Sequence, residues 1–307
     1  MALRCATPAE ISLAATFPQR IANAPRTHWP YMSTHQARGT RPAVPGETLV
    51  MQPADGWAGA AEGWWRWGQM FEPALDPVNA ALVDLAEIRP AQRVLDVATG
   101  FGEPALTATR RVGPAGSVVV AGSEDQALAG ASFDAVLCRF GLSFIPDLAG
   151  TLKRLLTLLV PGGRLAAAAW GSPARCPALT VPLTTLRQYL ELPPVPPGAP
   201  GLFGLGAEGV IEDELNFAGF THVRSCHHTL LFEWTSPEAF ARFHQVAAVP
   251  LLGVAVRPGK HEDELRAALL GAAQARAGRD GGVRLEADVV VVAGRRAPSV
   301  SDRHDAD

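Results

Sequence analysis

The residues with the clearest chemical potential are two glycines, Gly100 and Gly102, in the stretch VLDVATGFGEPAL that runs from Val94 to Leu106. An apolar run precedes these glycines and a helix-compatible run follows them. The stretch therefore predicts a buried strand, a glycine turn and a helix. A turn without side chains lets backbone N–H groups and the N-terminus of the helix approach a ligand closely. We expect this turn to be the ligand site of the protein.

The same turn also satisfies a dinucleotide pattern, because residues 100–105 read G-x-G-x-x-A. This keeps an NAD-type oxidoreductase as an alternative. Glu103 argues against it, since a carboxylate at a helix N-terminus repels a pyrophosphate and tolerates a ligand with a cationic end. The sequence also offers no Tyr–Lys or His–Asp arrangement that can be placed as a catalytic pair, so this alternative ranks last.

Strand-like and helix-like segments alternate along the chain, which predicts an α/β fold with a Rossmann-like, open, mostly parallel sheet and helices on both faces. The expected strands are residues 93–98, 117–121, 133–138, 165–170, 222–226, 229–234 and 287–293. The expected helices are residues 76–86, 103–112, 148–160, 209–217, 237–246 and 261–276.

The domain organisation follows from composition. Residues 1–50 hold five Arg, no Lys and two acidic residues, which predicts a disordered leader, with an organelle-targeting peptide as the alternative. Residues 51–296 form the predicted domain, in which the segments 171–208 and 235–280 are expected to lie on the substrate side. Residues 297–307 are polar and are expected to form a disordered tail.

Charge and cysteine content exclude several classes of protein. The net charge is only −3 and no block of Lys and Arg stands out, so we expect no nucleic-acid partner and instead a small-molecule substrate. The apolar runs are far shorter than the roughly 20 residues of a membrane span, and a cytoplasmic location is expected. Four scattered cysteines favour a reducing compartment. No metal site is expected, because Cys226, His227 and His228 alternate between the faces of a strand.

Four segments together resemble one family: VLDVATGFGEPAL, RRVGPAGSVV, ASFDAVLCRFGLSFIPD and LVPGGRLAAAAWG, in that order. They are similar to the class I S-adenosylmethionine-dependent methyltransferases, and within these to the branch of the ubiquinone/menaquinone C-methyltransferases. The resemblance covers residues 57–296. It implies a seven-stranded sheet whose last strand is antiparallel, S-adenosylmethionine as the cofactor, and methyl transfer to a small, fairly apolar acceptor.

By this resemblance, Asp96 orients the glycine turn and lies near the methionine end of the cofactor, and Arg139 and Phe140 line the cofactor and open onto the substrate. A satisfied core carboxylate for Asp96 and simple packing for Phe140 are the alternatives. No catalytic residue is identified, since methyl transfer needs no nucleophile from the protein. The implied cofactor contacts are Asp96, Ala98, Gly100, Gly102, Arg139 and Phe140.

The chain departs from this family between its second strand and FDAV, where only residues 122–132 intervene. A helix with a further strand needs about twice that length, so the third strand and its helix are expected to be absent. The ribose-binding acid of the family falls at Ser123, which is no acid. Glu124 lies 22 residues after Gly102 and either replaces that acid or is a solvated loop residue.

Loss of that strand would leave the second strand at the sheet edge, which favours self-association and possible homo-oligomers. It also raises a rival to an active enzyme: a catalytically impaired protein with a methyltransferase fold that acts through protein contacts.

Overall fold

The computed structural model describes residues 71–100, 102–122, 125, 128, 130–188, 200–245 and 260–298. The chain divides into two units, residues 1–45 and 46–307, and every described residue belongs to the second. The expected leader therefore lies outside the described residues, as does nearly all of the expected tail.

Six strands and a set of helices make up the described part of this unit. The strands are β1 (Arg93–Val97), β2 (Ser117–Ala121), β3 (Phe133–Arg139), β4 (Leu159–Trp170), β5 (Thr221–Trp234) and β6 (Val283–Arg295). The α-helices are the segment 71–85, α2 (Ala105–Val112), α3 (Leu148–Leu158), α4 (Pro177–Arg187), α5 (Val210–Ala218), α6 (Pro237–Phe243) and α8 (Lys260–Gln274). The 3-10 helices are η3 (Gly141–Phe144) and η4 (Pro173–Arg175).

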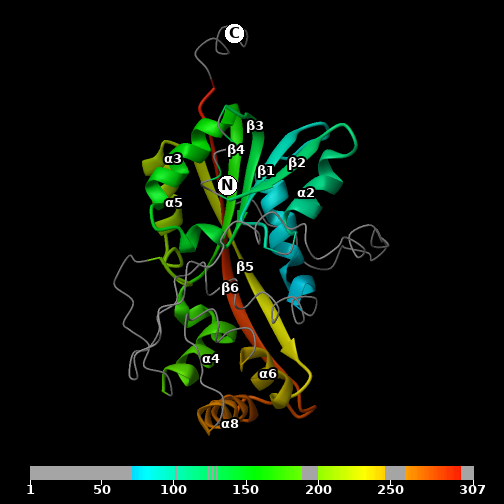
Figure 1. Ribbon diagram of the computed structural model, residues 1–307, viewed down its shortest axis with the longest axis vertical. Helices are drawn as coiled ribbons and strands as arrows, with labels where there is room; N and C mark the ends of the chain where they lie inside the picture. Colours follow the sequence, from blue (N-terminus) through cyan, green and yellow to red (C-terminus); the bar gives the residue numbers. More distant parts are fainter. Residues whose placement is uncertain are drawn as a thin grey trace, which may run out of the picture. The chain divides into compact units, whose positions relative to one another are not determined.

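The strands form one sheet in the order β2-β1-β3-β4-β6-β5 (Figure 1). Strands β1 to β4 run parallel, and β6 is antiparallel to both β4 and β5. This confirms the predicted α/β class with its open, mostly parallel, Rossmann-like sheet and antiparallel last strand. In the described part of the chain, β2 is the edge strand on the side opposite β5.

Helices cover both faces of the sheet because side chains along each strand alternate between two cores. Val94 of β1 belongs to a core shared with helix 71–85, α2, α4, α6 and α8, whereas its neighbour Leu95 belongs to a core shared with α3 and α5. Asp96 is two residues after Val94 in the strand, so its side chain lies on the same face of the sheet as that of Val94. No helix in the described ranges is both long and apolar enough to cross a membrane.

The boundary between α3 and β4 corrects the expected one. Helix α3 ends at Leu158 instead of residue 160, and β4 begins at Leu159 instead of residue 165. The cause is an irregular register with β3: Phe133 pairs with Leu159, and Ala135 then pairs with Arg164. The segment 160–163, which contains a proline and two glycines, is accommodated in this irregularity, where a missing backbone N–H does not disrupt the ladder.

Strands β5 and β6 are longer than expected and extend beyond the rest of the sheet. The two expected strands 222–226 and 229–234 are one strand, and β6 starts at Val283 instead of residue 287. Pairing of β4 with β6 ends at Val289, but β5 and β6 continue to pair as far as Trp234 and Val283. Each satisfies the backbone of the other, and Figure 1 shows them running on past the other strands to α6 and α8.

Two helical segments exceed the expectation. Helix α4 lies within the segment 171–208, for which the sequence analysis expected a substrate-side position but no helix. Pro177 is compatible with this helix because it lies in the first turn, where no backbone N–H is needed. The helix before β1 already includes Phe71, ahead of the expected start at residue 76, since its apolar stripe begins there with Phe71, Leu75 and Val78.

Candidate cofactor site at the carboxyl end of β1

The glycine turn follows β1 directly and has the conformation that glycine favours. Gly100 has φ of 62° and Gly102 has φ of 103°, and a Cβ atom at Gly100 would meet no described atom within 4 Å beyond its neighbours in the chain. The backbone at Gly100 is therefore open to a close-lying group. Ala98 also has a positive φ of 60°, which is uncommon for a residue with a side chain.

Asp96 is fully buried at the carboxyl end of β1. Among the described residues, neither of its carboxylate oxygens has a hydrogen-bond partner, and the hydroxyl of Thr99 in the turn also has none. Burial raises the pKa of the Asp96 carboxyl to about 7, and the charge of Glu103 also raises it, although the hydroxyl of Thr99, the guanidinium of Arg139 and the backbone N–H of Ala105 lie near enough to lower it. A buried carboxylate that makes no close hydrogen bond within the described residues is unfavourable, so this position matches a ligand that brings a cation or hydrogen-bond donors.

Glu103 occupies the place where a pyrophosphate would bind. One of its carboxylate oxygens accepts a hydrogen bond from the backbone N–H of Thr107, at 3.1 Å, and the other is paired with Arg110 at 3.0 Å. One backbone N–H of the first turn of α2, that of Thr107, thus already has an acid of the chain itself as its acceptor. This geometry disfavours a dinucleotide and accords with the prediction made from the sequence.

Arg139 binds to the helix that precedes β1 and not to an open space. Its guanidinium donates to both carboxylate oxygens of Glu72, at 2.8 and 2.9 Å, and to the side-chain oxygen of Asn79 at 3.0 Å. Only 8% of the Arg139 side chain is exposed. These hydrogen bonds hold helix 71–85 against the carboxyl end of β3. The contact of Arg139 with the cofactor stays a prediction.

Phe140 follows Arg139 with a positive φ of 65°, and its ring stacks on Trp170 at the end of β4. The two ring centroids are 4.2 Å apart and the planes differ by 5°. The N–H of Phe140 donates to the carbonyl of Ala168, so the backbone of β4 holds this turn in place. Gly141, the next residue, lies so close to Ala98 that a Cβ atom on it would be 2.8 Å from the Cβ of Ala98. The stacked pair of Phe140 and Trp170 therefore lies beside the glycine turn.

Glu124 and Ser123 lie outside the described residues, and so does Phe101 in the glycine turn. The structure therefore places Asp96, Ala98, Gly100, Gly102, Arg139 and Phe140 at one edge of the sheet, the carboxyl edge, where open α/β sheets bind ligands. The proposed ribose contact at Glu124 stays a prediction.

A buried ion cluster on β6 escaped the sequence analysis. Asp288 is 3% exposed and accepts from Arg175 at 3.0 Å, while Nδ1 of His227 lies 2.9 Å from its other oxygen. Its only sequence signal is a single acid at the start of the apolar run VVVVA. Sγ of Cys226 lies 3.5 Å from Nε2 of His228. The side chain of His227, between them in the strand, points to the opposite face of the sheet, as strand alternation predicts. The described residues include no group of three or more potential metal ligands.

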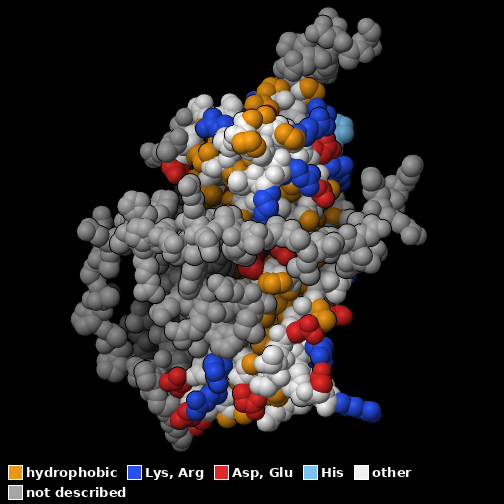
Figure 2. All heavy atoms as spheres, turned by 90° about the vertical axis from the view of Figure 1, so that its right-hand side faces the viewer, with side chains coloured by type: hydrophobic (Ala, Val, Ile, Leu, Met, Phe, Trp, Pro, Cys, Tyr) orange, Lys and Arg blue, Asp and Glu red, His pale blue; other side chains and the backbone are white. Residues whose placement is uncertain are grey.

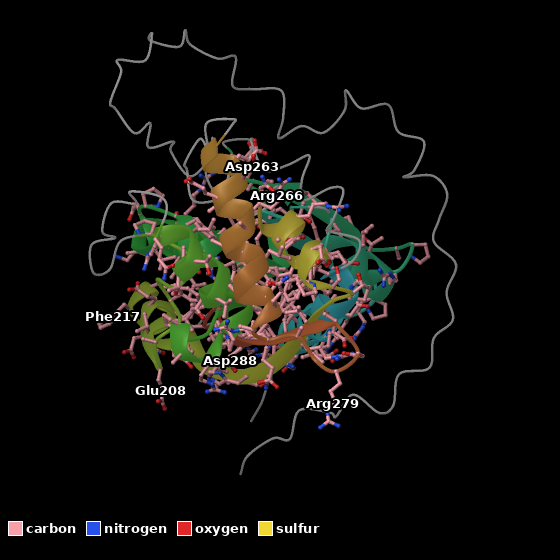
Figure 3. The ribbon with its side chains drawn as sticks, turned by 90° about the horizontal axis from the view of Figure 1, so that it is seen from below. Glu208, Phe217, Asp263, Arg266, Arg279 and Asp288 are labelled. Carbon is pink, nitrogen blue, oxygen red and sulfur yellow. The ribbon has the colours of Figure 1, made fainter. Side chains whose placement is uncertain are left out.

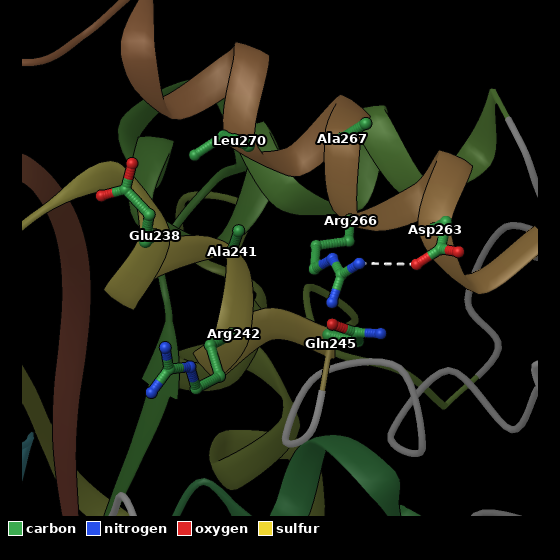
Figure 4. Close-up of a pocket in the computed structure, with 8 residues that line it drawn as sticks. All are labelled: Glu238, Ala241, Arg242, Gln245, Asp263, Arg266, Ala267 and Leu270. Carbon is green, nitrogen blue, oxygen red and sulfur yellow. Dashed lines mark hydrogen bonds and ion pairs between the residues drawn. The ribbon is translucent and has the colours of Figure 1, made fainter.

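Two cavities are formed by described residues away from the glycine turn. One, of about 370 Å³, lies between α6 and α8, where Arg266 is bound to Asp263 (Figures 3 and 4). The other, of about 430 Å³, lies at the amino ends of β3 and β4 and includes Asp134 and Arg164. Neither is at the carboxyl edge, so the chemistry of the turn rests on Asp96 and its surroundings.

Comparison with known proteins gives this arrangement a context. Residues 91–167, from just before β1 into β4, match the protein family described as "Methyltransferase domain". The fold is a class I methyltransferase fold. A methyltransferase domain of this kind uses S-adenosylmethionine as its cofactor.

Two curated relatives share part of the chain. Nocamycin O-methyltransferase of Saccharothrix syringae is 29% identical over 202 residues, which cover 53% of this chain and 71% of that protein. The ubiquinone/menaquinone biosynthesis C-methyltransferase of Pseudomonas putida is 32% identical over 111 residues, 27% of this chain and 43% of that protein. The chain thus spans less than half the length of the second relative. Among solved structures, the YcgJ protein of Bacillus subtilis aligns with a TM-score of 0.45 and 13% identity, covering 72% of this chain and 98% of that one.

Proposed function

We propose that this protein transfers a methyl group from S-adenosylmethionine to a small, fairly apolar acceptor. The observation that carries the proposal is the buried carboxylate of Asp96, which makes no close hydrogen bond within the described residues, beside the backbone of Gly100 at the carboxyl end of β1. The match of residues 91–167 to a methyltransferase domain and the name of the nocamycin relative support it.

The residues of the turn fit the polar part of this cofactor. Bound S-adenosylmethionine supplies an electrophilic methyl group on a sulfonium and also carries an ammonium group. Asp96 would pair with that ammonium, which provides the partner its carboxylate lacks. Gly100 and Gly102, with Ala98 before them, would present backbone groups to the adenosyl and amino acid parts. Glu124 is the proposed contact of the ribose hydroxyls.

Positioning and removal of water are what the protein has to provide for an in-line methyl transfer. The stacked rings of Phe140 and Trp170 form an apolar face next to the turn, and such a face attracts a cation such as a sulfonium. The ion pair of Arg139 with Glu72 fixes helix 71–85 over the same edge and so keeps the site closed on that side. These side chains are positioning groups, and no proton acceptor is assigned.

The acceptor would enter between the carboxyl edge and the helices α4, α6 and α8, within the segments 171–208 and 235–280. These helices contribute apolar side chains to the core on the Asp96 face of the sheet, which fits an apolar molecule. One of the two relatives is named as an O-methyltransferase and the other as a C-methyltransferase. These names favour neither oxygen nor carbon as the acceptor atom, and identification of the methylated product decides between them.

A second candidate function rests on β2. This strand forms an edge of the described sheet, and Val120 on it is 46% exposed. Figure 2 looks onto this side of the molecule and shows hydrophobic side chains there among charged ones. The edge position of β2 within the described sheet supports our proposal that a third strand is absent, and thus a protein with weakened cofactor binding that acts through protein contacts.

Calorimetric titration of the full chain separates these functions. Micromolar binding of S-adenosylhomocysteine, weakened at least tenfold by Asp96→Asn, supports methyl transfer. The matched control is Asp213→Asn, which alters an exposed acid of α5, a helix that packs on the opposite face of the sheet. If the folded protein binds none of S-adenosylmethionine, S-adenosylhomocysteine and NAD, the result favours the second candidate. Selective binding of NAD would overturn both candidates.

A further inference from the structure

The cavity at the amino ends of β3 and β4 lies at the edge of the sheet opposite the glycine turn. Its volume is about 430 Å³, a size typical of sites for small molecules. Three arginines, Arg89, Arg164 and Arg295, line it together with two acids, Glu87 and Asp134. Positive groups therefore outnumber negative groups on its walls.

Neighbouring strands present arginines on one face of the sheet at this end. Arg164 of β4 and Arg295 of β6 stand directly opposite each other in the antiparallel ladder. Arg224 of β5 pairs with Ala293, two residues before Arg295, so its side chain lies on the same face. Like charges directly opposite each other in an antiparallel pair are destabilising. A negative charge between these side chains would stabilise this end of the sheet.

The acids beside the cavity compensate this charge only in part. One oxygen of Glu87 is 2.9 Å from the guanidinium of Arg164 and 3.2 Å from that of Arg224. Its other oxygen is 3.8 Å from Arg89. Asp134 accepts a hydrogen bond at 2.7 Å from the backbone N–H at the start of β1. A single carboxylate is thus shared by three guanidinium groups.

Arg295 has the most hydrogen-bonding capacity left for a ligand. Its Nε donates to the carbonyl of Gly162 at 3.1 Å, and within the described residues this is the one hydrogen bond of its side chain. A Cβ atom at Gly162 would be 3.0 Å from Nη2 of Arg295, so the glycine leaves room for the guanidinium. The Nη groups of Arg295 are therefore available to a ligand in the cavity that this residue lines.

The chemistry of these donors favours a phosphate group. Guanidinium groups form paired hydrogen bonds with phosphate oxygens, and a phosphate monoester offers three oxygens and about two negative charges. We propose that this cavity is a second ligand site, which binds a small molecule bearing a phosphate group through Arg89, Arg164 and Arg295. Because the site lies at the amino edge of the sheet, this inference does not depend on the proposed function.

Calorimetric titration of the full chain with sodium pyrophosphate, at constant ionic strength, tests the site. The wild type is expected to bind with a dissociation constant below about 1 mM. Arg295→Met should weaken binding at least about tenfold, because charge-assisted hydrogen bonds are lost. Arg89→Met, which changes a side chain that is 75% exposed, should also weaken binding. The matched control is Arg279→Met, which removes an equal charge at an exposed position ahead of the other end of β6 and should bind as the wild type does.

Removal of the shared carboxylate gives a test of the opposite sign. Glu87→Gln releases guanidinium groups from their acid and should tighten pyrophosphate binding about fivefold, whereas Asp213→Asn, at an exposed acid of α5, should leave it unchanged. Weaker binding by a folded Glu87→Gln protein would contradict the proposed role of the arginines.

Three further results would overturn the assignment. The first is a folded wild type that binds no pyrophosphate at about 10 mM. The second is an equal loss of affinity in Arg295→Met and Arg279→Met. The third is displacement of pyrophosphate by S-adenosylhomocysteine, which would place the anion at the glycine turn. If Arg295→Met does not fold, Arg89→Met makes the same comparison. Malonate, a dicarboxylate, is titrated in parallel, and binding as tight as that of pyrophosphate would refute the preference for phosphate.

Discussion

Asp96 should release its proton when the cofactor binds. In the free protein, burial raises the pKa of this carboxyl from 3.8 to about 7, so it is about half protonated at pH 7 and about nine-tenths protonated at pH 6. An ammonium group placed beside it favours the charged form and returns the pKa toward its ordinary value. We therefore expect S-adenosylhomocysteine to release about 0.9 protons at pH 6 and about 0.5 at pH 7.

The same shift sets the pH dependence of affinity. Below the raised pKa, each pH unit opposes binding by about 1.4 kcal/mol, because the carboxyl must first lose its proton. The dissociation constant of S-adenosylhomocysteine should hence increase about 50-fold between pH 7 and pH 5. A carboxyl with an ordinary pKa of 3.8 would give almost no change over this range.

Isothermal titration calorimetry in two buffers with different ionisation enthalpies measures the number of protons released. Asp96→Asn has no proton to release and should bind weakly with a flat pH profile. Methylthioadenosine, which lacks the amino acid part, is the matched ligand and should release none from the wild type. If the wild type releases no proton on binding S-adenosylhomocysteine at pH 6, or if Asp96→Asn releases as many, the assignment of Asp96 to the ammonium is wrong.

Three further predictions concern stability and association. Arg139→Met leaves the partly buried Glu72 without its partner and should lower the free energy of unfolding by about 2 kcal/mol in urea titrations, whereas Arg111→Met, which removes an ion pair with Asp84 that is exposed on both sides, should change it by less than about 1 kcal/mol; equal losses would contradict a positional role for Arg139. His244 has a lowered pKa of about 3, so the unfolded chain binds the extra proton between that value and 6.5. The stabilisation of the fold by the neutral His244 ring is complete above pH 6.5 and declines as the pH falls. Between pH 6.5 and 3, the free energy of unfolding of the wild type should therefore fall by about 1.4 kcal/mol per pH unit relative to His244→Phe. A difference between the two proteins that does not change with pH would refute the buried neutral ring. Val120→Lys on the exposed edge strand β2 should shift sedimentation toward a monomer, and unchanged self-association would exclude this edge as the contact.

Local sequence patterns were sufficient for the class of fold. Strand β2 has the expected bounds Ser117–Ala121, and β1 differs from its expected end by a single residue, because short apolar runs that are rich in valine and bounded by turn residues favour strands. The glycine turn was equally predictable, since positive φ angles such as those of Gly100 and Gly102 are readily adopted only by glycine.

Patterns that depend on a partner strand were not predictable in the same way. The extension of β6 from residue 287 back to Val283 depends on its pairing with β5, which comes from a segment about 50 residues earlier in the chain. The start of β4 at Leu159 likewise reflects its register with Phe133, and a proline followed by two glycines gave no local sign of a strand.

The sequence alone therefore determined where the protein makes its turn for a ligand and which kind of sheet carries it, because backbone preferences and apolar periodicity are properties of neighbouring residues. Only the tertiary structure decided what surrounds that turn. It placed Arg139 against Glu72, and it buried Asp96 and His244 where neither makes a close side-chain hydrogen bond within the described residues, because burial and electrostatic environment arise from segments that meet only when the chain has folded.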